Sequence, residues 1–251
     1  MTESYMQHLS QWSISLIVLI LFYIFSAGFL GILAYGAYAA GIISLNSFNF
    51  VLETEVLLSL SIAIFLYSKF YKRESIGTAL RSLGLSKESI SLNAAWIGFL
   101  LFVTILLFEI AVSAFEGFSN ITINTNASVL FTGAPLWFYI FTAVIEPINE
   151  EIVFRGFLID RINLISNTTI SRFLRSGYDS NWIGIVVSAV IFGLLHASYD
   201  STFAIEVIAA MFFGLLAGYV FKKSGSLYPS IITHILVNSL AVSALLVIMW
   251  R

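Results

Sequence analysis

The 251-residue chain contains no cysteine, and only 10% of its residues are charged. The lack of cysteine excludes disulfide bonds, thiol nucleophiles and thiolate metal sites together. Ordinary soluble domains carry about a quarter charged residues, so the scarcity of charge argues against a soluble protein. The net charge of −2 provides no strongly basic surface, and we expect no nucleic-acid partner.

What the chain has in abundance is hydrophobic residues, which make up 59% of it. Apolar runs of about 20 residues recur along the whole length, which is typical of proteins with several membrane-spanning helices. The first run has no basic segment before it and is longer than the apolar core of a signal peptide, so we expect a retained helix. The expected spans cover about 12–36, 53–71, 93–115, 135–154, 182–198, 203–221 and 227–250.

The sequence therefore predicts an all-α fold, a polytopic transmembrane helical bundle in which residues 1–251 form a single integral membrane domain. We expect seven or eight spans, because the stretch between Glu3 and Glu53 carries no charge and could hold one helix or two. The segment 72–92 is predicted to be either an amphipathic helix at the membrane surface or a polar loop.

Lysine and arginine predict the orientation of the bundle. They gather in 72–92 and 156–181, whereas 116–134 and 198–202 contain none. Under the positive-inside rule the first two segments face the cytoplasm, and the other two face outside with the C-terminus.

The motif "EPINEEIVFRGF" places three glutamates and an arginine at the inner end of the fourth expected span. Glu151 and Arg155 are spaced i,i+4 with the glutamate first, which favours an ion pair. Glu150 lies about 100° away on another helix face, on the same side as Glu146 four residues earlier. A carboxyl without a cation in this setting suits a general base. A charged helix end in the headgroup layer would also explain these residues. In either case the motif lies nearer the cytoplasmic side.

Two further stretches place polar side chains inside expected spans. In "FGLLHA", Phe192 and His196 share one face of the fifth span, and in "THILVNS", His234 and Asn238 share one face of the seventh. A single membrane histidine commonly makes a hydrogen bond between helices. Two histidines, an asparagine and Glu150 on three spans can instead converge on one hydrated pocket.

Taken in order, "EEIVFR", "FGLLH" and "HILVN" resemble the three motifs of the CPBP family. This is the family of CAAX proteases and bacteriocin-processing proteins, also called Abi, and it includes the type II CAAX prenyl endopeptidases. The resemblance covers about 135–250, a little under half of the chain. It implies an intramembrane endopeptidase in which Glu150 activates the attacking water and His196 helps to hold that water. His234 and Asn238 would donate hydrogen bonds to the oxyanion of the tetrahedral intermediate.

The same resemblance implies supporting roles for three more residues, since Glu151 and Arg155 would stabilise the site and Phe192 would pack the pocket. Glu146 is a fourth supporting candidate because its spacing places it on the same helix side as Glu150. The substrate would be a membrane-associated peptide or protein, prenylated or of the leader type, and no cofactor would be needed. A covalent mechanism has no support, since the chain lacks both cysteine and a "GxSxG" elbow.

Two alternatives remain open. Glu150, His196 and His234 could bind zinc and leave a fourth position for water, although the helical "HExxH" signature is missing. The chain could also be a non-catalytic membrane protein, either an immunity protein that binds a peptide or a proton-coupled transporter.

The remaining intramembrane carboxyls are Glu109 and Glu206, which we expect to be protonated contacts between helices without a catalytic role. A shared site also raises a question of depth. Counted from the membrane surfaces at 1.5 Å per residue, Glu150 and His196 differ in depth by more than about 10 Å. Sharing a site requires that the fifth helix begin below the membrane, or that the segment 196–202 be sunk into the protein.

Overall fold

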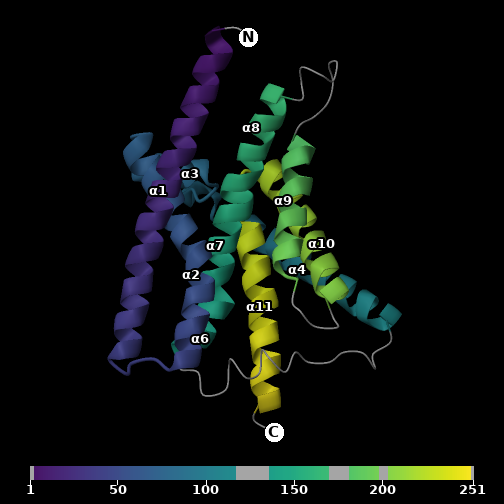
Figure 1. The fold of residues 1–251 in the computed structure, drawn as a ribbon. Helices are drawn as coiled ribbons and strands as arrows, with labels where there is room; N and C mark the ends of the chain where they lie inside the picture. Colours follow the sequence, from purple (N-terminus) through teal and green to yellow (C-terminus); the bar gives the residue numbers. More distant parts are fainter. Residues whose placement is uncertain (1–2, 117–135, 170–180, 198–202, 250–251) are drawn as a thin grey trace. The chain divides into compact units, whose positions relative to one another are not determined.

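The computed structural model describes residues 3–116, 136–169, 181–197 and 203–249, and its regular structure within these ranges is helical throughout (Figure 1). This confirms the predicted all-α fold. The chain divides into two compact units, Met1–Ala79 and Leu80–Arg251. That the whole chain forms a single domain stays a prediction.

The first unit is a helical hairpin of α1 (Glu3–Ala39) and α2 (Leu45–Leu66), and a π-helical turn, η1 (Tyr67–Tyr71), extends α2. Ser44 begins α2 because its hydroxyl accepts a hydrogen bond from the Ser47 N–H, which has no carbonyl partner in the first turn. The two helices are joined by a hydrogen bond from Ser26 Oγ to the Ser59 carbonyl oxygen, at 2.9 Å. The charge-free stretch therefore holds one long helix and the start of a second.

The segment 72–92 forms two short helical pieces, α3 (Ile76–Ser82) and the 3₁₀ turn η2 (Lys87–Ser89). Gly84 lies between them with φ +76°, a left-handed conformation that ends a helix and that glycine adopts without strain. The segment is therefore neither one continuous amphipathic helix nor a plain polar loop.

The second unit contains α4 (Leu92–Glu116) and a continuous helix, Leu136–Thr169, which we call the site helix. The site helix consists of five consecutive segments: α6 (Leu136–Ile140), η4 (Phe141–Ile145), α7 (Glu146–Glu151), η5 (Ile152–Leu158) and α8 (Ile159–Thr169). Three helices follow, α9 (Asn181–Leu195), α10 (Phe203–Ser224) and α11 (Tyr228–Met249).

Within the second unit the site helix packs against both α9 and α11 (Figure 1). Helix α10 packs against α9, and α4 packs against α11 and α10. A cluster of buried aliphatic and aromatic side chains joins the site helix, α9, α10 and α11: Ile159, Ile185, Phe221, Leu227 and Ile231. This apolar cluster fixes the helices around the polar residues described below.

Helices α9 and α10 approach closely because small residues face each other. A Cβ at Gly214 would lie 2.9 Å from both Cα and Cβ of Ala189. Small residues at a helix contact let two backbones approach in a membrane, where lipid is as apolar as the side chains themselves. The packing of α10 therefore depends on glycine at position 214.

The register between α9 and the site helix answers the question of depth. Gly184 N–H donates to Asn163 Oδ1 at 2.8 Å, and Ser188 Oγ donates to the Phe154 carbonyl oxygen at 2.9 Å, so the helices are antiparallel. Eight residues on from Ser188 lies His196, and eight residues back from Phe154 lies Glu146. Helix α9 thus begins beside α8, well past the carboxylates, and ends at their level. A shared site requires either that the fifth helix begin below the membrane or that 196–202 be sunk into the protein. The register favours the first arrangement.

Within the described residues, four helices are long and apolar enough to cross a membrane: Ile14–Ala39, Leu92–Val112, Glu206–Ser224 and Tyr228–Val247. Trp182–Leu195 is a shorter apolar helix. Each of the seven predicted spans overlaps a helix, but a count of seven or eight crossings stays a prediction. So does the orientation, and the predicted outer segments 117–134 and 198–202 lie outside the described residues.

Candidate active site

The site helix departs from α-helical geometry on both sides of its acidic motif. Before the motif, the Glu146 N–H bonds to the Phe141 carbonyl five residues back, and Pro147 has no N–H to donate. After it, the Ile159 N–H bonds to the Phe154 carbonyl in the same way. Such π-helical turns change which residues share a face, and they are frequent at functional sites.

Glu151 and Arg155 form the ion pair that their spacing predicts. Arg155 Nη1 lies 3.0 Å from Glu151 Oε1, and the two side chains are 1% and 0% exposed. The same carboxylate oxygen lies 2.9 Å from His234 Nδ1 on α11. Because a carboxylate accepts and does not donate, this contact places the Nδ1 proton on the histidine. Glu151 therefore joins the site helix to α11.

Glu150, the predicted base, lies on the other side of the same imidazole. Its Oε2 is 3.6 Å from His234 Nε2, and the two side chains are 9% and 6% exposed. Within the described part of the chain, this oxygen has no hydrogen-bond partner. The structure thus places His234 between two buried glutamates, each facing a different ring nitrogen.

Aromatic rings enclose this charged group. The guanidinium of Arg155 lies over Phe192 at 4.3 Å and over Phe213 at 4.9 Å, measured from Cζ to each ring centroid. Phe213 also contacts the His234 ring edge-on, with centroids 4.9 Å apart. Phe192, which is predicted to pack the pocket, is 2% exposed. Phe213 was not predicted, because nothing in the sequence separates it from the other 22 phenylalanines.

His196 follows the last residue of α9 and is partly buried. Its Nδ1 lies 2.8 Å from the carbonyl oxygen of Phe192, one helical turn earlier, and its ring packs on the Phe192 ring at 4.4 Å. The carbonyl accepts, so Nδ1 carries the proton and Nε2 of the neutral ring is an acceptor.

Asn238 lies one turn after His234 on α11. Its Nδ2 donates to the Thr142 carbonyl oxygen at 3.1 Å, within the π-helical turn η4. An amide nitrogen carries two hydrogens, so one N–H remains for another acceptor. Glu146, the remaining predicted site residue, is half-buried on the site helix.

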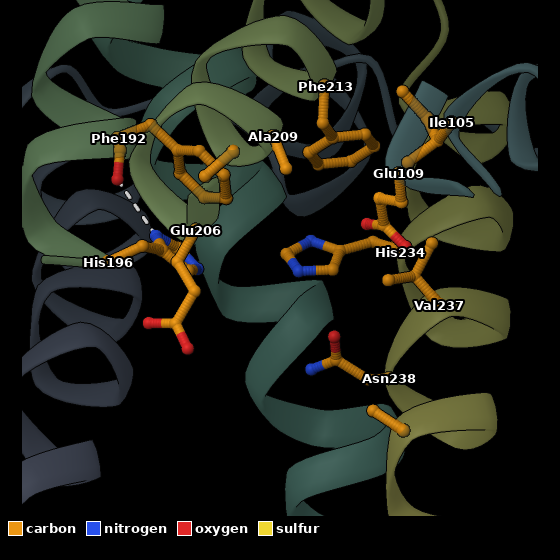
Figure 2. A pocket seen from close by; sticks show the side chains of 12 residues that line it. Ile105, Glu109, Phe192, His196, Glu206, Ala209, Phe213, His234, Val237 and Asn238 are labelled. Atoms are coloured by element: carbon orange, nitrogen blue, oxygen red, sulfur yellow. Dashed lines mark hydrogen bonds between the residues drawn. The ribbon is translucent and has the colours of Figure 1, made fainter. Parts of the chain in front are cut away.

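A cavity of about 420 Å³ opens within the second unit, between α4, α9, α10 and α11. His196, His234 and Asn238 line it, and Figure 2 shows these side chains turned toward the same space. Glu150 is not among its lining residues, but its Oε2 lies 3.6 Å from Nε2 of His234, which is among them. The structure therefore brings three of the four predicted catalytic residues to one cavity and the fourth next to one of its lining residues.

Two carboxyls expected to be mere contacts between helices also line this cavity, Glu109 on α4 and Glu206 on α10. The sequence identified both as intramembrane carboxyls but gave no reason to bring them to the histidines, because neither belongs to a motif. Among the described residues, no three His, Asp or Glu side chains are grouped so that they could hold a metal ion.

Comparison with known proteins gives a family match for part of the chain. Residues 132–240 match the family model described as type II CAAX prenyl endopeptidase Rce1-like. No curated protein and no solved structure matches the chain. The matched range contains the acidic motif, both cavity histidines and Asn238, and the four long apolar helices agree with the membrane setting of a CAAX protease. The chain is therefore an integral membrane protein in which residues 132–240 are similar to the Rce1-like type II CAAX prenyl endopeptidases.

Proposed function

We propose that the chain is an intramembrane endopeptidase that hydrolyses a membrane-associated peptide, prenylated or of the leader type, with water activated by Glu150. The observation that carries this proposal is the buried Glu150 carboxylate, which faces His234 at 3.6 Å in the wall of a cavity. Two atoms at that separation can both hydrogen-bond one water molecule. The match of residues 132–240 to a protease family supports the same proposal.

In the proposed reaction one water molecule hydrogen-bonds to both Glu150 Oε2 and His234 Nε2. Glu150 takes a proton from this water as its oxygen attacks the carbonyl carbon of the peptide. The carbon–nitrogen bond then breaks, and Glu150 returns the proton to the leaving nitrogen. His196 Nε2, an acceptor in the neutral ring, receives the second hydrogen bond of the water and orients it.

Two donors are available for the oxyanion that forms when water attacks. Asn238 has its second amide hydrogen, and His234 Nε2 carries a hydrogen when the ring is protonated. A protonated His234 would balance the local charge, since Glu150 and Glu151 would then face Arg155 and an imidazolium. Donors fixed where negative charge develops are worth several kcal/mol in a site that excludes water.

The decisive experiment is cleavage of a peptide library by the purified protein in detergent. Glu150→Gln should abolish turnover and retain peptide binding, because the amide keeps the shape of the side chain but cannot take a proton. Glu88→Gln, an exposed change in η2, is the matched control and should cleave normally. Undiminished turnover by Glu150→Gln would contradict the proposed base, and binding without cleavage by the native protein would favour a non-catalytic role.

The proposed reaction uses no metal, and a chelator tests the zinc alternative. Activity should survive prolonged treatment with a strong chelator. If the chelator abolished activity and zinc restored it, the same residues would still form the site. Glu150, His196 and His234 would then be zinc ligands.

We also propose that the site lies nearer the cytoplasm, from the distribution of lysine and arginine. Because the chain has no cysteine, a single Lys87→Cys substitution gives one reactive thiol at an exposed position. A membrane-impermeant reagent should label it from the cytoplasmic side. Labelling from the opposite side alone would reverse the orientation.

A further inference from the structure

An exposed aromatic pair lies where α9 begins and α10 ends. The rings of Trp182 and Tyr219 stack with their centroids 5.7 Å apart and an interplanar angle of 19°. The two residues are 49% and 41% exposed, and each lies near the end of an apolar helix, Trp182–Leu195 or Glu206–Ser224. Tryptophan and tyrosine gather where a membrane meets water, because their apolar rings carry a polar group. We therefore expect the pair to lie at the level of the lipid headgroups.

A lysine lies against this pair. Lys223 Nζ is 5.8 Å from the centroid of the Tyr219 ring, and the lysine side chain is exposed. The neighbouring Lys222 bonds to Asp160 at 2.8 Å, so the charge of that carboxylate is already matched. Within the described ranges, no carboxylate lies at ion-pair distance from Lys223. Lys223 therefore offers an uncompensated positive charge beside an exposed aromatic surface.

The chemistry of this patch matches an anionic phospholipid. Both lysines lie in the last turn of α10, where a cation interacts favourably with the helix dipole whether or not a ligand is present. The patch differs from a simple helix end because it combines a free ammonium with exposed rings. A phospholipid phosphate complements the ammonium, and the glycerol and upper acyl groups complement the rings. In the predicted orientation this end faces the cytoplasm, where anionic lipids make the membrane surface negative.

We propose that Lys223, Tyr219 and Trp182 form a binding site for the headgroup of an anionic phospholipid. The Lys223 ammonium binds the lipid phosphate, and the two stacked rings contact the groups below it. The site joins α9, which carries Trp182, to α10, which carries the other two residues. A lipid bound there stabilises the folded second unit, since a ligand that binds only the folded state shifts the unfolding equilibrium. The site does not depend on the proposed endopeptidase activity.

The test is thermal unfolding of the purified protein in an uncharged detergent, titrated with phosphatidylglycerol or with phosphatidylcholine of the same acyl chains. Phosphatidylglycerol should raise the unfolding temperature more, because the choline group carries a positive charge that Lys223 repels. Lys223→Gln should need about fivefold more phosphatidylglycerol for half of that rise, the effect of one lysine at a membrane surface. Lys223→Arg, which keeps the charge, should need about the same amount as the native protein. Equal rises with both lipids in the native protein would overturn the site.

Lys87→Gln in η2 is the matched control, because it removes the same charge from another exposed lysine of the second unit. It should leave the required amount of phosphatidylglycerol unchanged, whereas Tyr219→Leu should increase that amount without any change of charge. An equal increase in Lys87→Gln and Lys223→Gln would reduce the effect to general attraction by a positive surface, and would overturn the site. Inorganic phosphate that stabilised the protein as well as phosphatidylglycerol does would also overturn it, since the ligand would then be an ion and not a lipid.

Discussion

The two histidines of the cavity are held in different ways. His234 lies within α11, and each of its ring nitrogens faces a glutamate from another helix. His196 follows the end of α9, and its Nδ1 bonds to a carbonyl of that same helix. Replacing a histidine that is held by charges on another helix should lower both the stability of the fold and the catalytic activity. One held locally is positioned by the packing of its own helix, and its replacement should affect the chemistry with little effect on stability.

The largest effect on stability should come from replacing Arg155, the cation that pairs with Glu151 beside His234. Arg155→Ala should lower the free energy of unfolding by about 3–5 kcal/mol, because it leaves Glu151 buried without its counter-charge. Unfolding in detergent, followed by circular dichroism, measures this loss. Lys222→Ala breaks a more exposed pair with Asp160 and should cost about 0–1 kcal/mol. Equal losses of unfolding free energy in both variants would show that the buried pair stabilises the fold no more than the exposed pair does.

The next effect concerns catalysis. Asn238→Ala should reduce kcat by about 10²–10³-fold, as expected for the loss of one oxyanion donor, and leave weak residual activity. Steady-state kinetics that separate kcat from KM provide the measurement. A change confined to KM would assign Asn238 to substrate binding instead.

A direct comparison of the histidines should show a smaller difference. His234→Ala should cost about 1.5–3 kcal/mol of stability, since it removes a hydrogen bond to a buried charged group. His196→Ala should cost less than about 1 kcal/mol, because its bond is local and lies at a helix end, yet it should lose activity. Unfolding and turnover measured on the same preparations test both statements. Equal destabilisation would remove the distinction between the two histidines.

The smallest effect tests the packing that positions α9. Gly214→Ala should destabilise by about 1–3 kcal/mol, because the added methyl group would meet Ala189. Gly36→Ala in α1 is the matched control, since nothing lies within 4 Å of its added methyl group. The control should be neutral or stabilise the first unit by up to about 1 kcal/mol. Unfolding in detergent shows whether each variant is less or more stable than the native protein. A Gly214→Ala variant of unchanged stability would argue against close packing.

Local patterns predicted what neighbouring residues in one helix do. The pairing of Glu151 with Arg155 follows from i,i+4 spacing, and the seven expected spans overlap helices because apolar runs need little long-range information. The bond of His234 to Glu151 could not be predicted, since it joins residues 83 positions apart on antiparallel helices. Their register is decided by packing.

The depth of His196 illustrates the same limit. Counting residues assumed that the fifth helix begins at the membrane surface, whereas α9 begins beside Asn163, far along the site helix. The sequence also could not predict that Glu109 and Glu206 line the same cavity, because they are isolated carboxyls on different helices and belong to no common motif.

The π-helical turns of the site helix make its chemistry depend on residue count. Each such turn holds one residue more than an α-helical turn, and η4 and η5 flank the glutamates. The wide turn η4 could absorb the removal of one residue by returning to regular winding, but removing one residue from the α-helical segment α7 would shift the helical phase of Thr142 relative to Glu150 by about 100°. A one-residue deletion that a lipid-facing helix could absorb would here separate the carbonyl that anchors Asn238 from the carboxylate beside His234. The spacing between these residues is therefore as much a part of the site as their identities.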